Sequence, residues 1–273
     1  MIPPAFTYVR ANSVDEAIGL AAEHGEDAKY LAGGQSLLPL MKLRFAAPTV
    51  LIDLGRVSEL SYIRDKGNHV AIGALTRHHD VATSALLLSD IPLLAHTAEA
   101  VGDPQIRHRG TIGGSVAHAD AAADLPASLL ALDTTFVIHG AAGERSVPAS
   151  EFFRGIFETV IEPGELLTEI QVPKPAAPAA WSFQKFNKRA IDFAIVGVAV
   201  QGTAVALVNM GSTPLRATAV ESALASGASP ADAAALAAEG TNAGSDIHAT
   251  REYREHLARV LVRRALEEAS ARA

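Results

Sequence analysis

The sequence predicts an α+β fold in three consecutive segments, 1–55, 56–175 and 180–273. Helical and strand patterns alternate along the chain without a fixed repeat. Hydrophobic residues make up 49% of the 273 residues, which is enough for a sizeable core, and charged residues make up only 19%. A stretch rich in Pro and Ala, 173–180, is typical of a linker and separates the last segment from the others.

The first segment is expected to form a small unit with a glycine turn where its first strand ends. Ser13 and Glu16 have the spacing of a capping box, which predicts a helix that ends at His24. Ser36 is expected to cap a second helix. The strands of this segment are expected at 29–32 and 49–54.

The middle segment is expected to contain hairpins and helices. Lys66-Gly67-Asn68 has the composition of a hairpin turn. The hairpin strands are expected at 62–64 with 69–72, and at 135–139 with 145–147. The helices are expected at 81–88, at 93–101 and at 125–132, the last beginning near Asp124.

The third segment is expected to place helices on a small sheet. Its strands are expected at 181–186, 193–200 and 204–209, and its helices at 215–225, 230–239 and 251–269. In the last helix the spacing of four residues predicts one face that packs on the sheet: Tyr253, Leu257, Val260 and Leu261.

Composition excludes several classes of protein. The net charge of -7 argues against a general nucleic-acid surface. The absence of cysteine excludes disulfides, cysteine-ligated zinc and an all-cysteine iron–sulfur cluster held by this chain. The N-terminal residues lack the pattern of a signal peptide, and the apolar stretch 193–210 is too interrupted for a membrane span. We therefore expect a cytoplasmic protein.

Two double glycines in matching contexts carry the strongest functional signal. They lie in Ala32-Gly33-Gly34-Gln35-Ser36 and in Thr111-Ile112-Gly113-Gly114-Ser115. Glycine permits positive φ and close approach to a ligand, and successive amides in such turns bind anions. Each segment alone is compatible with a plain structural turn, but two of them suggest a phosphate-bearing ligand. Neither fits the Rossmann fingerprint or the P-loop, and Ser36 lacks the G-x-S-x-G context of a hydrolase nucleophile.

These segments, in this order and at this chain length, resemble the FAD-binding medium subunit of the molybdenum hydroxylases, in particular the carbon monoxide dehydrogenase medium-chain family. The resemblance covers nearly the whole chain and extends to 102–107, 124–127, 192–194 and the C-terminal helix. The carbon monoxide enzymes usually have His at the position of Gln35 and Asn at that of Ser115, so the resemblance does not specify carbon monoxide as the substrate.

The resemblance implies a PCMH-type FAD-binding fold, with two α+β subdomains followed by a C-terminal domain of a sheet and helices. It implies FAD as the cofactor, with the two glycine segments on its pyrophosphate. Asp124 matches a position that bonds the polar middle portion or the ring of FAD, and Leu167 and Lys185 match positions that line the flavin ring. A lysine there would favour the anionic reduced flavin. The implied cofactor-binding residues are Ala32, Gly33, Gly34, Gln35, Ser36, Leu37, Thr111, Ile112, Gly113, Gly114, Ser115, Asp124, Leu167 and Lys185.

Several other polar residues have competing interpretations. His118 follows the second glycine segment closely, so it either lies near the cofactor or is a solvated loop histidine. His78 and His79 invite a metal interpretation, but adjacent residues of a helix point apart. The arginines of the last helix form either a solvated face or a docking surface. We expect no metal site and no acid–base catalytic residue in this chain.

The resemblance implies a role in electron exit within a heterotrimer that is expected to dimerise. A large subunit with molybdopterin would hydroxylate the substrate, and a small iron–sulfur subunit would pass electrons to FAD on this chain and then to an external acceptor. Two alternatives remain at this point: a self-contained FAD-dependent oxidoreductase with its own substrate pocket, and a non-catalytic FAD-binding module.

Overall fold

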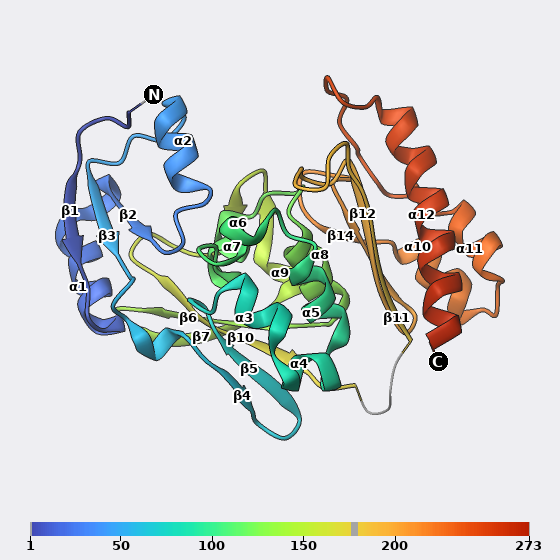
Figure 1. Ribbon diagram of the computed structural model, residues 1–273, viewed down its shortest axis with the longest axis horizontal. Coiled ribbons are helices and arrows are strands. Elements are labelled where there is room, and N and C mark those ends of the chain that lie inside the picture. The colour runs from blue at the N-terminus through green and yellow to red at the C-terminus, as the bar shows by residue number, and fades with distance from the viewer. Residues whose placement is uncertain (1, 176–179, 273) are drawn as a thin grey trace.

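Three sheets follow one another along the molecule in the computed structural model, which describes residues 2–175 and 180–272 (Figure 1). The N-terminal sheet has three strands, the central sheet five and the C-terminal sheet four. The N-terminal unit lies at one end of the long axis and the C-terminal helices lie at the other (Figure 1). The molecule is therefore α+β, with helices between and outside its sheets.

The N-terminal sheet is parallel, with strand order β1-β3-β2. Its core forms where Val50 and Ile52 pack with Ala17 and Ala21 of the first helix. The elements are β1 (Thr7–Arg10), α1 (Val14–His24), η1 (Gly25–Asp27), β2 (Ala28–Leu31), α2 (Leu37–Leu43) and β3 (Val50–Asp53).

Two helix caps in this unit depart from the expected chemistry. The Ser13 hydroxyl accepts from the amide of Glu16, as expected, but the Glu16 carboxylate accepts from the amide of Asn12 and so forms no reciprocal box. Ser36 occupies the cap position of α2, yet its hydroxyl makes no capping hydrogen bond because its backbone is already in the αR region. The Ser36 hydroxyl is therefore not used in holding the helix.

The central sheet has the order β4-β5-β10-β6-β7 and is antiparallel throughout. Its middle strand, β10 (Leu166–Pro173), was not expected from the sequence. Both expected hairpins form: β4 (Ile63–Asp65) with β5 (His69–Gly73), and β6 (Thr135–Gly140) with β7 (Gly143–Pro148). A short pair, β8 (Phe153–Gly155) and β9 (Glu158–Thr159), follows α9 (Ala149–Phe152).

Short helices cover one face of the central sheet (Figure 1). They are α3 (His78–Thr83), α4 (Ala85–Asp90), α5 (Pro92–Glu99), α6 (Pro104–Arg107), α7 (Ile112–His118) and α8 (Asp124–Ala131). The short helix η2 (Ser58–Leu60) precedes β4 and places Leu60 in the core of the N-terminal unit. The single helix expected at 81–88 is wrong, because Ser84 is extended and ends α3 while its hydroxyl caps α4 through the amide of Leu87. The helix expected from Asp124 is confirmed.

The C-terminal sheet, β11-β12-β13-β14, is antiparallel and carries three helices. Its elements are β11 (Trp181–Phe186), β12 (Val196–Gln201), β13 (Ala204–Val208), β14 (Leu215–Arg216), α10 (Thr218–Ala225), α11 (Pro230–Ala235) and α12 (Arg251–Arg272). The expected strand 193–200 begins later, at Val196, and the helix expected at 230–239 ends at Ala235. The helix expected at 215–225 begins only at Thr218, because Leu215 and Arg216 pair with β13.

The face of α12 that packs on the sheet is also displaced from the expected one. Leu257 and Leu261 are buried as expected, but Tyr253 is 44% exposed and Val260 is only half-buried. Arg254, one of the arginines expected to form either a solvated face or a docking surface, is instead buried and donates to the carbonyl of Ile195 and to Asp246. In the described part of the chain, no helix has the length and hydropathy that a membrane span requires.

One hydrophobic core joins the central sheet to the C-terminal sheet. It runs from Ile72 and Ile170 through Leu125 and Leu129 of α8 to Val208 of β13. Helices α5 and α8 therefore lie against both sheets, α5 through β11 and α8 through β12 and β13.

Candidate cofactor site

The two glycine segments, 32–36 and 111–115, lie next to each other in the fold. The first is the turn after β2, and the second contains the first turn of α7. A Cβ atom on Gly114 would lie 3.9 Å from the Cβ of Ala32, which shows how close the two segments are.

Close backbone contacts explain the first glycine of each pair. A Cβ atom on Gly33 would lie 2.4 Å from the carbonyl oxygen of Arg109, and one on Gly113 would lie 2.6 Å from that of Ala74. Neither glycine has a positive φ; only Gly34 does, at 71°. The first glycine of each pair is therefore needed because two stretches of backbone approach each other, a contact that any side chain would prevent.

The two segments differ in the backbone donors that they offer. The amides of residues 33 to 37 have no hydrogen-bond acceptor among the described residues. In the second segment every amide from 112 to 115 is already used: the acceptors are the carbonyls of Thr76, Ala74 and Thr111 and the Thr111 hydroxyl. The expectation of two equivalent anion-binding turns is therefore wrong for the second segment, whose amides hold α7 in place.

Side chains of the second segment divide into buried and accessible ones. Ile112 and Gly113 are buried, and Thr111 caps α7 by accepting from the amide of Gly114 at 3.1 Å. Gly114 and Ser115 are partly exposed. Ile112 can therefore position the helix but does not reach a ligand with its side chain.

Asp124 and Lys185 form a buried ion pair between α8 and β11. Their Oδ2 and Nζ atoms lie 2.7 Å apart, and the side chains are 5% and 8% exposed. Burial outweighs the attraction of the Lys185 ammonium and raises the pKa of Asp124 to about 6. Lys185 also donates to the carbonyl of Ala100 at the C-terminal end of α5, while Asp124 Oδ1 has no partner among the described residues.

The ion pair lowers the effective charge of Lys185. A free lysine cation beside the ring would stabilise an anionic reduced flavin. Because its ammonium is held by Asp124, a nearby group would experience the field of a pair rather than that of a full positive charge. Among the described residues Asp124 Oδ1 has no hydrogen-bond partner, and the Lys185 ammonium uses two of its three donors, so both groups can bond a ligand.

Leu167 and His118 lie in different surroundings. Leu167 is 3% exposed, in β10, where the pairing with β6 has an irregularity between Leu167 and Glu169. His118 is the last residue of α7 rather than a solvated loop residue, and its ring stacks on Phe157 with centroids 4.9 Å apart. Burial lowers the pKa of His118.

The histidines that invited a metal interpretation are separated in the structure. His78 is buried, whereas the ring of His79 stacks on that of His108 with centroids 4.1 Å apart. Within residues 2–175 and 180–272, no three side chains of His, Asp or Glu gather as metal ligands would.

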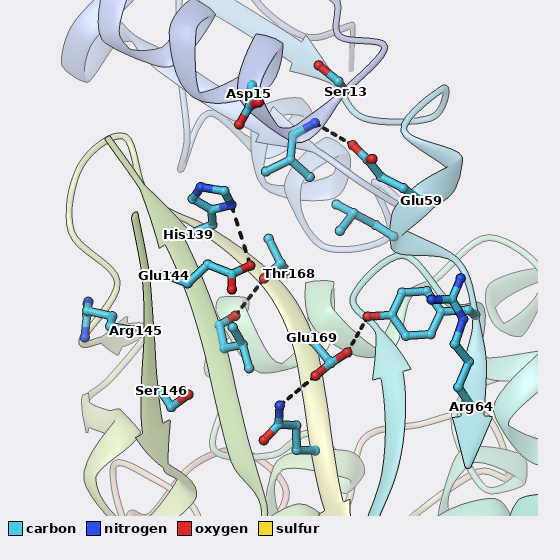
Figure 2. Close-up of a pocket in the computed structure, with 15 residues that line it drawn as sticks. Ser13, Asp15, Glu59, Arg64, His139, Glu144, Arg145, Ser146, Thr168 and Glu169 are labelled. Carbon is cyan, nitrogen blue, oxygen red and sulfur yellow. Dashed lines mark hydrogen bonds and ion pairs between the residues drawn. The ribbon is translucent and has the colours of Figure 1, made fainter. Parts of the chain in front are cut away.

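A separate concavity of about 720 Å³ lies on the face of the central sheet beside α1 (Figure 2). Two of its carboxylates are hydrogen-bonded: Glu169 accepts from Tyr62 at 2.6 Å, and Glu59 accepts from the amide of Val14 at 2.8 Å. None of the residues expected to bind the cofactor lines it.

Two family models together cover most of the chain. Residues 4–175 match the FAD binding domain in molybdopterin dehydrogenase. The chain belongs to this FAD-binding family. Residues 181–269 match the CO dehydrogenase flavoprotein C-terminal domain, so both halves of a flavoprotein medium subunit are present in one chain.

Relatives of this medium subunit confirm the family over the full length. The carbon monoxide dehydrogenase medium chain of Hydrogenophaga pseudoflava is 41% identical and covers 100% of this chain and 99% of its own. A 6-hydroxypseudooxynicotine dehydrogenase complex subunit alpha from Paenarthrobacter nicotinovorans is also 41% identical, over 100% of this chain and 97% of its own.

Solved structures give the same result. The carbon monoxide dehydrogenase from Hydrogenophaga pseudoflava that lacks the Mo-pyranopterin moiety contains a chain with a TM-score of 0.97 and 42% identity, covering 100% of both chains. Quinoline 2-oxidoreductase from Pseudomonas putida 86 gives a TM-score of 0.92 and 35% identity over 100% of this chain and 99% of its own. The expected fold, the cofactor FAD and the class, an oxidoreductase subunit of the molybdenum hydroxylases, are thereby confirmed.

The fold of this flavoprotein subunit also brings Arg77, which has no distinguishing pattern in the sequence, to the glycine segments. The backbone of Arg77 forms an antiparallel bridge with Thr111, and its guanidinium donates to the carbonyl of Arg109. Arg77 is separated from both segments in the sequence, so only the fold reveals its position.

Proposed function

We propose that this chain holds FAD along the contact between its two glycine segments and serves as the electron exit of a molybdenum hydroxylase. Electrons would come from [2Fe–2S] clusters on a small subunit and leave to an external acceptor. The observation that carries the proposal is the run of amides at 33–37, which have no acceptor in the described part of the chain and lie beside a second glycine segment, in a chain of the FAD-binding family.

The free amides of the first segment fit a pyrophosphate. A turn that presents successive N–H groups binds anionic oxygens without a counter-ion in the protein. The side chain of Gln35 folds back on the carbonyl of Gly33 at 3.2 Å and so leaves these donors uncovered. Ser36 and Ser115 add hydroxyl groups, since the Ser36 hydroxyl makes no helix cap.

The remaining proposed residues orient the ring end of the cofactor. Asp124 Oδ1 is a buried acceptor without a partner among the described residues, which fits a hydrogen-bond donor of the cofactor. Lys185 holds that carboxylate in place, and Leu167 supplies an apolar wall. When bound, FAD accepts two electrons and passes them on, while the protein contributes position and electrostatics.

We further propose that the iron–sulfur clusters and the molybdopterin are held by other chains. Because the chain has no cysteine, all-cysteine clusters have to be supplied by another subunit. We infer that this chain forms a heterotrimer with an iron–sulfur small subunit and a molybdopterin large subunit. We also propose that the heterotrimer dimerises and that it lies in the cytoplasm. We also propose that 1–55 and 56–175 enclose the cofactor and that 180–273 supports it.

Flavin reduction tests this role. The chain is mixed anaerobically with its partner subunits and the organic substrate, and flavin absorbance is followed in a stopped-flow instrument. We expect rapid bleaching only in the full assembly, and oxidation of chemically reduced flavin by an acceptor in the lone chain. Rapid bleaching of the lone chain by substrate would favour a self-contained oxidoreductase, and no electron transfer in either setting would favour a non-catalytic FAD module.

A further inference from the structure

Arg77 occupies the junction between the two glycine segments. It is paired with Thr111 in an antiparallel bridge flanked by two hydrogen bonds, from His78 N to Gly110 O and from Ile112 N to Thr76 O. This pattern defines the close, non-hydrogen-bonded type of pair, in which opposite side chains lie on the same face. The Arg77 side chain therefore starts beside the residue that caps α7.

The other end of the Arg77 side chain lies next to the first segment. Its Nη1 donates to the carbonyl oxygen of Arg109, and this is the oxygen against which Gly33 packs. A single half-buried guanidinium thus extends from the second glycine segment to the first.

Within residues 2–175 and 180–272, the positive charge at this junction forms no ion pair. No carboxylate of the described residues lies within 4.0 Å of the charged nitrogens of Arg77, Arg107 or Arg109. Burial and then the charge of Arg109 lower the pKa of Arg77, while Asp80 and Asp53 only partly offset them. Asp53 is itself held by Tyr8 and by the amide of Gly55.

We propose that Arg77, assisted by Arg109, binds the diphosphate group of the dinucleotide at the junction of the two glycine segments. This inference rests on the proposed function and adds the cation that the site needs. The amides of the second segment already donate hydrogen bonds within the chain, so they are not free to donate to a phosphate there. A guanidinium presents several N–H donors in a fixed fork, and one donor on Arg109 O leaves others for phosphoryl oxygens.

A diphosphate fits this position better than an acidic partner segment. The amides at 33–37, which have no acceptor among the described residues, and the guanidinium both belong to this junction, so small tetrahedral groups with several acceptor oxygens can use both. The same chemistry could come from FAD itself or from a free nucleotide, and both are diphosphate esters of adenosine.

Binding measurements on the flavin-free chain test the proposal. FAD, ADP and riboflavin are titrated by calorimetry into the wild type and into Arg77→Gln, Arg77→Lys and Arg109→Gln. Arg77→Gln should weaken FAD and ADP binding by about 10- to 100-fold, because a charge-assisted hydrogen bond is lost. Riboflavin binding should not change, Arg77→Lys should be intermediate, and added salt should weaken FAD binding less in Arg77→Gln than in the wild type.

Arg64→Gln is the matched control, because Arg64 is exposed on β4, stacks on Tyr62 and also lacks a carboxylate within 4.0 Å. Circular dichroism identifies any variant that fails to fold. If Arg77→Gln does not fold, Arg109→Gln decides whether the proposal holds, because the Arg109 side chain is exposed. ADP binding only to the flavin-free chain assigns the site to the cofactor, and ADP binding to the FAD-loaded chain through Arg77 assigns it to a free nucleotide.

Unchanged FAD and ADP affinities in both Arg77→Gln and Arg109→Gln would overturn the inference, as would weaker subunit assembly with unchanged nucleotide binding. A wild-type chain that binds no FAD at all would instead refute the proposed function.

Discussion

Single residues act at the glycine segments mainly through their size. Gly33 and Gly113 both have ordinary dihedral angles, and both face a carbonyl oxygen at less than 3 Å from where a Cβ atom would be. The sequence predicted that small residues are required here, but not that the requirement comes from neighbouring backbone. That partner is invisible in the sequence, because Arg109 and Ala74 are far from the glycines along the chain.

Replacing Gly33 by Ala should therefore separate the two segments. The new Cβ would meet backbone atoms that cannot move alone, so we expect lower FAD content and a lower melting temperature. Gly19→Ala is the control, since that helical glycine has open space around it and should gain up to about 1 kcal/mol. Full FAD occupancy and unchanged melting in Gly33→Ala would contradict the close contact.

His78 should make the stability of the protein depend on pH. Burial, and then the charges of Arg77 and Arg107, lower its pKa to about 4, so the folded protein resists protonation that the unfolded chain accepts near 6.5. The free energy of unfolding should fall as the pH drops from 6.5 to 4, by about 3 kcal/mol from this group. Urea unfolding should show a flatter pH dependence in His78→Gln than in the wild type, and no such change in the exposed control His248→Gln.

At the scale of elements, hairpins and long helices were predictable, and strands that pair only at a distance were not. Lys66-Gly67-Asn68 marked the first hairpin through local turn chemistry, which needs no tertiary information. The central strand β10 follows a turn at Pro163-Gly164, but this turn does not indicate its partners, because β5 and β6 come from distant parts of the chain. The two-residue strand β14 was likewise assigned to a helix, since its pairing with β13 overrides local propensity.

The site was predictable to a similar extent. The glycine motifs were evident because their composition is unusual, whereas the ion pair of Asp124 with Lys185 depends on packing α8 against the C-terminal sheet. Arg77 had no signal at all, since a lone arginine before two histidines is ordinary in a sequence.

The Asp124–Lys185 pair should stabilise the contact between α8 and β11. Lys185→Met leaves a carboxylate buried without its cation, and we expect a loss of about 3–5 kcal/mol in the free energy of unfolding. The double variant Asp124→Asn with Lys185→Met should recover much of this loss, because no charge remains buried. Denaturant unfolding of the four proteins in this cycle measures the coupling, and additive losses would show that the two residues act independently.

On the scale of the whole molecule, the three sheets are not equally connected. One core unites the central and C-terminal sheets, whereas the N-terminal unit has a core of its own that includes Leu75 and Leu166 from the central segment. The glycine contact lies where this unit meets α7 and the 109–110 backbone. A cofactor held there would bridge the two bodies, so its binding should be coupled to the stability of the N-terminal unit.

FAD should accordingly raise the melting temperature of the flavin-free chain in a concentration-dependent manner. A ligand that binds only the folded state stabilises it by about 2.7 kcal/mol at a hundred times its dissociation constant. Hydrogen exchange should show the gain in protection at residues 28–43 before it appears in α12, because the first lies at the junction and the second lies beyond the shared core. Equal protection at both places would indicate that the cofactor does not bridge the units.

The division of cofactors between subunits can be measured on the isolated chain. Iron–sulfur clusters of the all-cysteine type require thiolates that this chain does not have, and no three potential ligands converge among the described residues. The glycine junction, in contrast, offers free amides and an arginine without a carboxylate partner among those residues, which suits a dinucleotide. We therefore expect the purified chain to be yellow, with one FAD per chain by absorbance after denaturation and with negligible iron and molybdenum by elemental analysis. Stoichiometric iron on the lone chain would contradict the assignment of the clusters to another subunit, and its electrons would then not have to cross an interface to reach the flavin.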